Sequence, residues 1–393
     1  MKEFLTLLSL SMVLSLPAAA QKLDWNLNFD YLFRNYEFDR SSNIFEDSYT
    51  LHAARLTPEV GVLVKQDASV FHRVRAGVDL FKQMGEGLKA ADLIGEPVLY
   101  YDAEAAMRGG GRFEALAGIF PRRYCEGDYV GLYFDDDILF YDNNLEGILL
   151  KYRNNKVFAE LGLDWPGKIG DDAHPSRRER FQVFTAGLWN FAGRFSFGWT
   201  GSFYHFANSP TNHNVVDNHM LNPWLEWAPF SFMDELRITA GGVFTYQCDR
   251  QHDMDLRFPM GFLSRQVVSK WGIVLDNQFY FGDDLMPFFE TKFSDFPYGT
   301  ELYRGDLAFH TRLSGPGWFD MVNLKYEPSL TRWLKLSVAF SFFLGEPPAS
   351  SCPVFRGWQQ SVGLRVDLDA ARPHPKAPRS SGKKGVYFHG FML

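Results

Sequence analysis

Beyond its first twenty residues, the sequence lacks any apolar stretch of 18 residues, which is about the length a helix needs to cross a bilayer. This absence excludes a helical membrane protein. A sustained helical period of 3.6 residues is also missing. Cysteine is scarce: Cys125, Cys248 and Cys352 are the three residues of this type, and an odd number argues against a disulfide framework in an exported chain. The sequence leaves open whether two of the three form a disulfide, and which two.

The dominant pattern is an alternation of apolar and polar side chains with a period of two, which is typical of β-strands. The first run places apolar residues at alternate positions: Leu23, Trp25, Leu27, Phe29, Tyr31 and Phe33. Similar runs occur at 70–80, 157–165 and 334–342, with charged residues on the polar side. Runs of about 10 to 13 residues are long enough to cross a bilayer at a tilt. The pattern therefore predicts an all-β fold, a transmembrane antiparallel up-and-down β-barrel with lipid outside and water inside.

Composition agrees with this fold. Aromatic residues make up 17% of the chain, including 38 Phe, as expected where rings form girdles at both membrane interfaces. A large carbohydrate-binding sandwich is an alternative source of such an aromatic excess. The net charge of −7 disfavours nucleic acid as a partner.

Three segments are predicted along the chain. Residues 1–20 resemble a cleaved signal peptide, with Lys2 at a basic start, an apolar stretch over 4–16 and small residues at 18–20. Residues 21–369 form the barrel. Residues 370–393 form a basic, Pro-rich tail that would lie in the periplasm.

Sixteen strands are predicted within the barrel, with fourteen and eighteen as alternatives. Their approximate ranges are 23–34, 54–65, 70–82, 97–108, 112–120, 145–153, 156–165, 178–190, 194–206, 218–228, 234–247, 254–263, 270–281, 318–328, 332–344 and 357–369. Short turns follow the even-numbered strands and longer connections follow the odd-numbered ones, as in outer-membrane barrels. Residues 302–313 look strand-like, but assigning 282–317 to one external connection preserves this alternation of short and long connections.

The polar faces of the second to fifth strands carry many charges. Their basic members are Arg55, Arg73, Arg75 and Arg112, and their acidic members are Glu59, Asp79, Asp102, Glu104 and Glu114. Since neighbouring strands lie about 4.8 Å apart, these side chains would form a ladder of mixed charge on one wall. Such a ladder favours a water-filled lumen. A closed barrel plugged by the same network is the alternative.

The connection at 121–144 is both acidic and aromatic. It carries Asp135, Asp136, Asp137 and Asp142, interleaved with Tyr and Phe residues that need a surface to pack on. The three consecutive aspartates could bind Ca²⁺, but the spacing of a known calcium loop is absent, and a solvated acidic patch is favoured. No metal or cofactor is predicted.

These features together resemble the general bacterial porins, whose third external loop folds into the barrel and narrows the pore. The resemblance implies that the four arginines form the basic side of a constriction, and that Asp135, Asp136 and Asp137 form its acidic side. The chain departs from that family at its end, where a basic tail follows the last strand. The aromatic excess and the Ala20-Gln21 junction resemble exported proteins of the Bacteroidota type.

The resemblance implies a non-enzymatic channel of the outer membrane for passive diffusion of small hydrophilic solutes or ions. Implied partners are outer-membrane lipid and the barrel-assembly machinery, and the resemblance allows a homo-oligomer. Two other functions are open. One is a substrate-specific binding or transport barrel, and the other is a barrel enzyme acting on lipid or peptide. The histidines that an enzyme would use are His205, His213 and His219, close to Ser202, but no local catalytic signature accompanies them.

Overall fold

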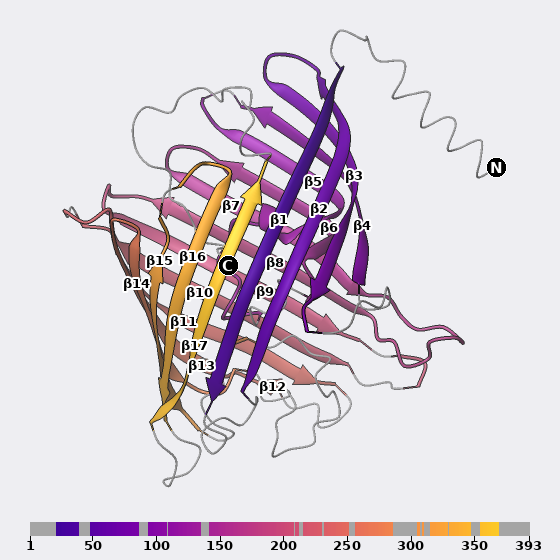
Figure 1. The fold of residues 1–393 in the computed structure, drawn as a ribbon. Helices are drawn as coiled ribbons and strands as arrows, with labels where there is room; N and C mark the ends of the chain where they lie inside the picture. The colour runs from indigo at the N-terminus through magenta and orange to yellow at the C-terminus, as the bar shows by residue number, and fades with distance from the viewer. Residues whose placement is uncertain are drawn as a thin grey trace.

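The chain folds into a barrel of long antiparallel strands (Figure 1). The computed structural model describes residues 21–38, 48–85, 93–107, 109–134, 141–207, 209–211, 215–229, 232–250, 256–285, 305–306, 309, 315–328, 330–346 and 354–368. The strands are β1 (Gln21–Phe38), β2 (Tyr49–Lys65), β3 (Val70–Gln83), β4 (Leu93–Ala106), β5 (Arg112–Pro121), β6 (Asn144–Arg153), β7 (Val157–Gly167), β8 (Arg180–Asn190), β9 (Phe195–Phe206), β10 (Val216–Trp227), β11 (Glu235–Asp249), β12 (Leu256–Arg257), β13 (Met260–Lys270), β14 (Ile273–Gly282), β15 (Gly317–Tyr326), β16 (Leu334–Gly345) and β17 (Phe355–Asp367).

Two of these strands share one place in the barrel. Both β12 and β13 pair with β11, and the break between them contains Pro259. Proline has no backbone N–H to donate to the ladder, so regular pairing is interrupted at this point. The Pro259 carbonyl still accepts a bond of 3.0 Å from the N–H of Thr245. The barrel therefore has sixteen strand positions, which confirms the predicted number.

The sheet closes on itself. β1 pairs with β2 along one edge and with β17 along the other, so the first and last strands lie side by side (Figure 1). Every strand pairs antiparallel with its neighbour in the ring, and no edge remains between β17 and β1. Closure pairs the backbone groups of the first strand with those of the last, as the hydrocarbon core of a membrane requires. The predicted antiparallel up-and-down barrel is confirmed.

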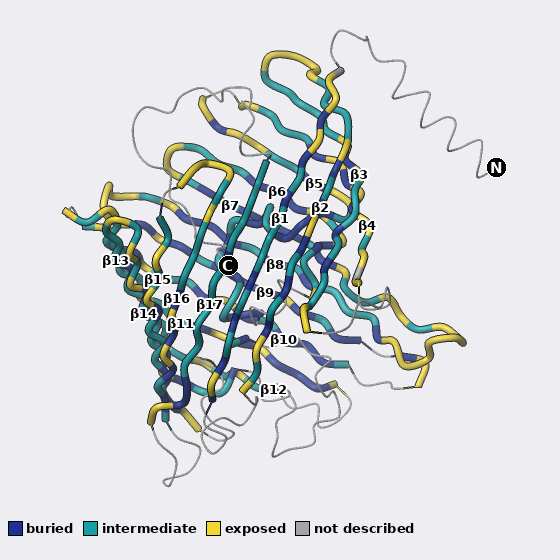
Figure 2. Tube along the Cα trace, viewed as in Figure 1, coloured by how far each residue is buried: buried dark blue, intermediate teal, exposed yellow. Residues whose placement is uncertain are grey.

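The two faces of the wall have opposite chemistry. Burial alternates along the strands (Figure 2), and the exposed members are apolar: Leu23 and Trp25 on β1 and Val60 on β2 are 76%, 44% and 55% exposed. Their polar sequence neighbours Asp24 and Glu59 are buried inside. A water-soluble protein distributes these residues the other way round. The outer surface is thus that of a transmembrane barrel, with an aqueous or polar interior.

One strand boundary was predicted wrongly. A connection was expected between the predicted strands 254–263 and 270–281, yet β13 continues to Lys270. The chain reverses instead at Trp271 and Gly272, whose φ values are 54° and 81°. Two residues with positive φ form the tight turn that matches the twist of a hairpin. The other fifteen predicted strands coincide with observed ones within a few residues. Short and long connections alternate as predicted except on either side of β11, where the two connections, 228–234 and 250–255, are of similar length.

Several predictions concern residues outside the described part of the chain. These are the signal peptide at 1–20, the tail at 370–393, the acidic residues Asp135–Asp137, and most of the connection at 282–317. They remain predictions. No helix in the described ranges is long and apolar enough to cross a membrane.

Candidate functional site in the barrel interior

The predicted charged wall forms on the inner face of β2–β5. Neighbouring strands bring opposite charges together in pairs, in register with the ladder. Arg55 lies 3.1 Å from Asp79, and Arg73 lies 2.6 Å from Asp102. Each of these pairs joins a base to a carboxylate on an adjacent strand. The wall arginines are therefore neutralised mainly by the wall itself.

The ladder continues towards the end of the barrel that carries the short turns. Arg112 lies 2.5 Å from Glu104, and its side chain is 46% exposed. Glu114 pairs with Lys151 on β6 at 3.0 Å. All nine predicted wall residues thus point to the interior, and the ladder extends one strand further than predicted. Lys151 was not included in the prediction, which considered only the second to fifth strands.

Arg75 is the centre of this network. Its guanidinium lies 2.5 Å from Asp24 on β1 and 3.6 Å from Glu59 on β2, and its side chain is only 1% exposed. Glu59 also accepts a bond of 2.8 Å from Arg123, in the connection after β5. A charge buried to this degree is tolerated because opposite charges surround it. Removing one partner would leave an uncompensated charge.

The connection after β5 folds into the barrel. A short 3₁₀ turn, η3 (Arg122–Tyr124), starts this inward course. The side chain of Arg122 lies 2.6 Å from Asp164 on β7 and 3.0 Å from Asp142, which belongs to the returning segment of the same connection. Asp142, one of the predicted loop carboxylates, therefore holds the end of the connection against its start through Arg122. We call residues 122–134 the infolded loop.

Glu160 on β7 anchors the middle of the infolded loop. Its carboxylate accepts bonds from the N–H groups of Glu126 and Gly127, at 2.7 and 3.0 Å, and from the hydroxyl of Tyr129 at 2.9 Å. A Cβ at Gly127 would lie 2.5 Å from the Cβ of Ala186, so only glycine permits this approach. Burial raises the pKa of the neighbouring Cys125 thiol well above its usual value.

The tip of the infolded loop reaches the opposite wall. Asp128 forms an ion pair with Arg265 on β13, and Arg265 is also bound by Asp276 on β14 at 2.7 Å. The hydroxyl of Tyr133 donates to Thr200 on β9 at 2.9 Å. In the ring of strands, β13 lies roughly halfway round from β5, where the loop begins. The infolded loop therefore spans the interior.

Aromatic packing holds the infolded loop against one half of the wall. The ring of Tyr129 packs edge-on against Phe184 of β8, with centroids 4.9 Å apart. Tyr129 and Tyr133 are both 2% exposed. The expectation that the rings of this connection need a packing surface is confirmed. The sequence offered no direct sign of that surface, because inward apolar residues such as Phe184 are indistinguishable from ordinary strand residues.

The long connection between β14 and β15 also contributes to the interior. The N–H of Asp306 donates to the carbonyl of Gly131 at the tip of the infolded loop, at 2.6 Å. Phe309 is fully buried and packs edge-on against Tyr280 of β14. Two external connections thus meet inside the barrel.

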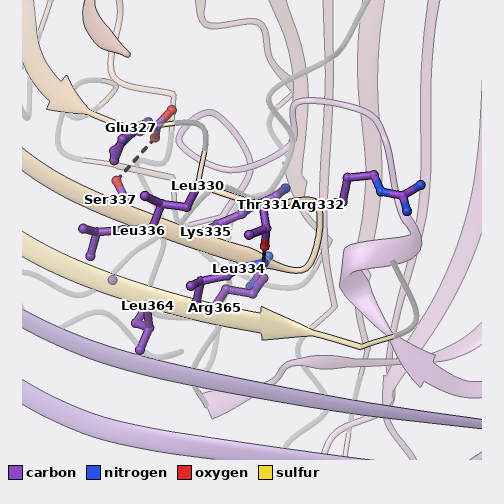
Figure 3. Close-up of a pocket in the computed structure, with 12 residues that line it drawn as sticks. Glu327, Leu330, Thr331, Arg332, Leu334, Lys335, Leu336, Ser337, Leu364 and Arg365 are labelled. Carbon is purple, nitrogen blue, oxygen red and sulfur yellow. Dashed lines mark hydrogen bonds between the residues drawn. The ribbon is translucent and has the colours of Figure 1, made fainter. Parts of the chain in front are cut away.

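Two cavities accompany this arrangement. A cavity of 60 Å³ lies between the tip of the infolded loop and the wall, lined among others by Asp128, Thr200, Trp224, Arg237 and Arg265. A larger one of 570 Å³ lies at the ends of β16 and β17 and the turn after β15 (Figure 3). Glu327 and Ser337 bond across its edge at 3.3 Å, and Lys335 and Arg365 supply positive charge.

The described residues do not assemble the serine–histidine site that an enzyme would use. Ser202 is buried on the inner face of β9 and accepts a bond of 2.5 Å from Gln182. His205 lies three residues further and points outwards, where it contacts Asp217 at 2.8 Å. His219 stacks on Tyr246 on the outer face, and His213 lies outside the described residues. Within the described ranges, no three His, Cys, Asp or Glu side chains are grouped so that they could hold a metal ion.

Three observations identify the architecture: the sheet of sixteen strand positions is closed, its outer face is apolar and its interior is polar. The chain is a porin-like outer-membrane β-barrel. Transmembrane barrels of this type belong to bacterial outer membranes, which agrees with the predicted location.

Solved structures of similar shape include outer-membrane proteins. The outer membrane protein OpdK from Pseudomonas aeruginosa is 10% identical, with a TM-score of 0.45 over 88% of this chain and 98% of that one. OmpT of Vibrio cholerae is 10% identical, with a TM-score of 0.49 over 90% and 99%. Salmonella typhi OmpF, solved with daunomycin, is 12% identical, with a TM-score of 0.47 over 90% and 99%. No protein-family model matches the sequence, and no curated protein matches it. At such low identities the fold assignment depends on the strand pairing of the chain itself.

Proposed function

We propose that the barrel is a porin-like channel through which small hydrophilic solutes and ions diffuse across the outer membrane. Sixteen-stranded barrels of this class enclose enough space for an aqueous channel. The observation that carries the proposal is the infolded loop, anchored on Glu160 on one side and Arg265 on the other. Because these contacts lie on opposite sides of the barrel, the infolded loop narrows the interior.

The proposed selectivity filter is the part of the interior beside the infolded loop, between the charged wall and the opposite wall of β13–β15. Partly accessible charges border this space: the side chains of Asp128, Arg265 and Lys325 are 30%, 20% and 27% exposed. Arg73 on the wall is 18% exposed, whereas Arg75 is almost completely buried. Fixed charges in a narrow pore filter ions by their field. Arg73 would act on a passing ion, and Arg75 would hold the wall together.

Ion selectivity in planar bilayers tests the proposal. Arg73→Gln removes one positive charge and leaves Asp24 and Asp102 in excess, so the reversal potential in a salt gradient should shift towards cation selectivity. The double variant Arg73→Gln with Asp102→Asn restores the balance of charge and should return towards the wild-type value. Arg112→Gln, at the exposed rim, should shift the potential less. Absence of conductance, or equal reversal potentials in all variants, would contradict the proposed filter.

Charge reversal at both Arg73 and Arg75, the simplest variant suggested by the sequence, is a poorer test. It would place two carboxylates beside Asp24 and Glu59 in a buried network, and the wall itself would be disturbed. Neutralisation of the more accessible Arg73 changes the charge at the filter and leaves the buried Arg75 in place. An effect on ion selectivity can then be distinguished from an effect on folding.

A dedicated transport barrel is the second candidate, favoured by the narrow cavity that combines Trp224 and Phe309 with Arg237 and Arg265. Liposome swelling distinguishes the two functions. A general channel admits many small sugars at rates that fall with size, whereas a dedicated one saturates with one class of solute.

A further inference from the structure

The cavity of 570 Å³ beside the last two strands lies at the end of the barrel that carries the short turns (Figure 3). Leu334 and Leu336 of β16, Leu364 of β17 and Leu330 of the turn after β15 all line it. Leu330 is 48% exposed. The volume is within the range of about 300–1,000 Å³ that is usual for sites that bind small ligands. The cavity is therefore large enough for several side chains, and it offers them apolar surface.

Polar groups also line this cavity. Glu327 and Ser337 are joined by a bond of 3.3 Å. Lys335 lies opposite Arg365 in the register of β16 and β17, and Arg365 is paired with Asp30 of β1 at 2.5 Å. An acyl chain has neither donors nor acceptors for such groups, whereas a peptide carries apolar side chains on a hydrogen-bonding backbone. The mixed lining therefore favours a peptide segment as the occupant.

The chain itself leaves the barrel beside this cavity. Arg365 lines it, β17 ends two residues later at Asp367, and the N–H of Asp367 donates to the carbonyl of Trp333 at 2.8 Å. Beyond this point the sequence has two parts: residues 369–385 are rich in proline and bases, and residues 386–393 read Val-Tyr-Phe-His-Gly-Phe-Met-Leu. We call residues 386–393 the apolar segment. It has no Asp, Glu, Lys or Arg, and it is shorter than the roughly 9–11 residues that a membrane strand needs.

We propose that the apolar segment docks in this cavity of its own barrel, whether or not the barrel conducts. The connecting residues 369–385 can span at most roughly 56 Å, so they reach a cavity that adjoins the end of β17. A segment on such a tether has an effective concentration of about millimolar, which favours docking even over a small contact area. The rings of Tyr387, Phe388 and Phe391 would cover the leucines, and the bases of the tether would stay in water. The docked segment would hold β16 and β17 together beside the seam where β17 meets β1.

Cross-linking within one chain tests the docking. In a background with all three native cysteines replaced by Ala, Leu364→Cys is combined with Phe391→Cys. The matched control combines Phe391→Cys with Ala192→Cys, in the exposed turn between β8 and β9 at the same end of the barrel and on its far side. A short bis-maleimide, applied to dilute protein in lipid vesicles, should join 364 to 391 within one chain and leave the control pair mostly unjoined. Equal yields for the two pairs, absence of the 364–391 product, or a product of twice the mass would overturn the proposal.

Protection of the cavity from a reagent is an independent measurement. Leu364→Cys alone, in the same background, should react several-fold more slowly with a maleimide in the full chain than in a chain shortened to residues 1–385, because the apolar segment covers it. Ala192→Cys should react at the same rate in both chains. Retention of the heat-modifiable mobility of a folded barrel establishes that the shortened chain has folded. Equal rates at position 364 in the two chains would refute the docking and would mean that lipid, or nothing, fills the cavity.

Discussion

At the residue scale, the interior charges of this barrel act in pairs that join neighbouring strands, such as Arg55 with Asp79 and Arg73 with Asp102. The alternation of polar and apolar residues placed Arg55, Arg73 and Arg75 on the inner face, because direction is set by a period of two. Their partners depend on strand register and on the infolded loop. Glu160 illustrates the limit: its inward direction follows from the pattern, but its three bonds to the loop come from a segment that leaves β5 and crosses the interior.

Replacing Glu160 should release the infolded loop. Glu160→Leu removes three hydrogen bonds to a charged acceptor, each worth about 1.5–3 kcal/mol. We expect larger single-channel conductance and faster proteolysis within 122–143. Glu160→Gln keeps one acceptor oxygen and should have an intermediate effect. A Leu variant with wild-type conductance and cleavage would show that Glu160 does not anchor the loop.

Cys125 reports the position of the infolded loop chemically. Burial raises the pKa of its thiol, so the reactive thiolate is a smaller fraction at neutral pH than for an exposed cysteine. With Cys248 and Cys352 replaced by Ala, maleimide labelling of the folded protein should be slow, and Glu160→Leu should accelerate it. Ala68→Cys with Cys125→Ala, in the exposed turn after β2, is the fast-reacting control. Equal labelling rates for the two cysteines would contradict the buried position.

At the element scale, strands were predicted more accurately than connections. Long alternating runs identify a membrane strand, whereas a two-residue turn has no recognisable sequence signal when one of its residues is tryptophan. The turn at Trp271-Gly272 was missed for this reason, since Asn-Gly or Asp-Gly is the usual signal. The connection after β5 was recognised as acidic and aromatic, but its inward course depends on a wall surface built by β7–β9.

Glycine at position 272 should be specifically required for the β13–β14 turn. Gly272→Ala places a side chain at a φ of 81°, which costs about 1–2 kcal/mol. Its Cβ would also lie 3.0 Å from the carbonyl oxygen of Glu327. Gly193→Ala has a similar φ of 71° and open space around it, so it isolates the backbone contribution. Denaturant unfolding in lipid vesicles should show a larger loss of stability for Gly272→Ala. Equal losses would mean that the contact with Glu327 is readily relieved.

At the scale of the whole molecule, the barrel, its strand number and the character of its two faces were predictable from the sequence. These properties depend on the alternation of polar and apolar residues within each strand and on the alternation of short and long connections between strands. Both can be read directly from the sequence. The division of the interior by the infolded loop was not predictable from the residues alone, because it joins β5 to β13 through contacts between distant segments.

The accessibility of four consecutive positions on β15 tests most directly whether hydrocarbon contacts one face and water the other. Val322 and Leu324 face outwards, and Asn323 and Lys325 face the interior. A nitroxide placed at each position in turn, in lipid-reconstituted protein, should relax mainly with oxygen at 322 and 324 and mainly with a water-soluble nickel complex at 323 and 325. Uniform accessibility to the nickel complex at all four positions would contradict the transmembrane barrel.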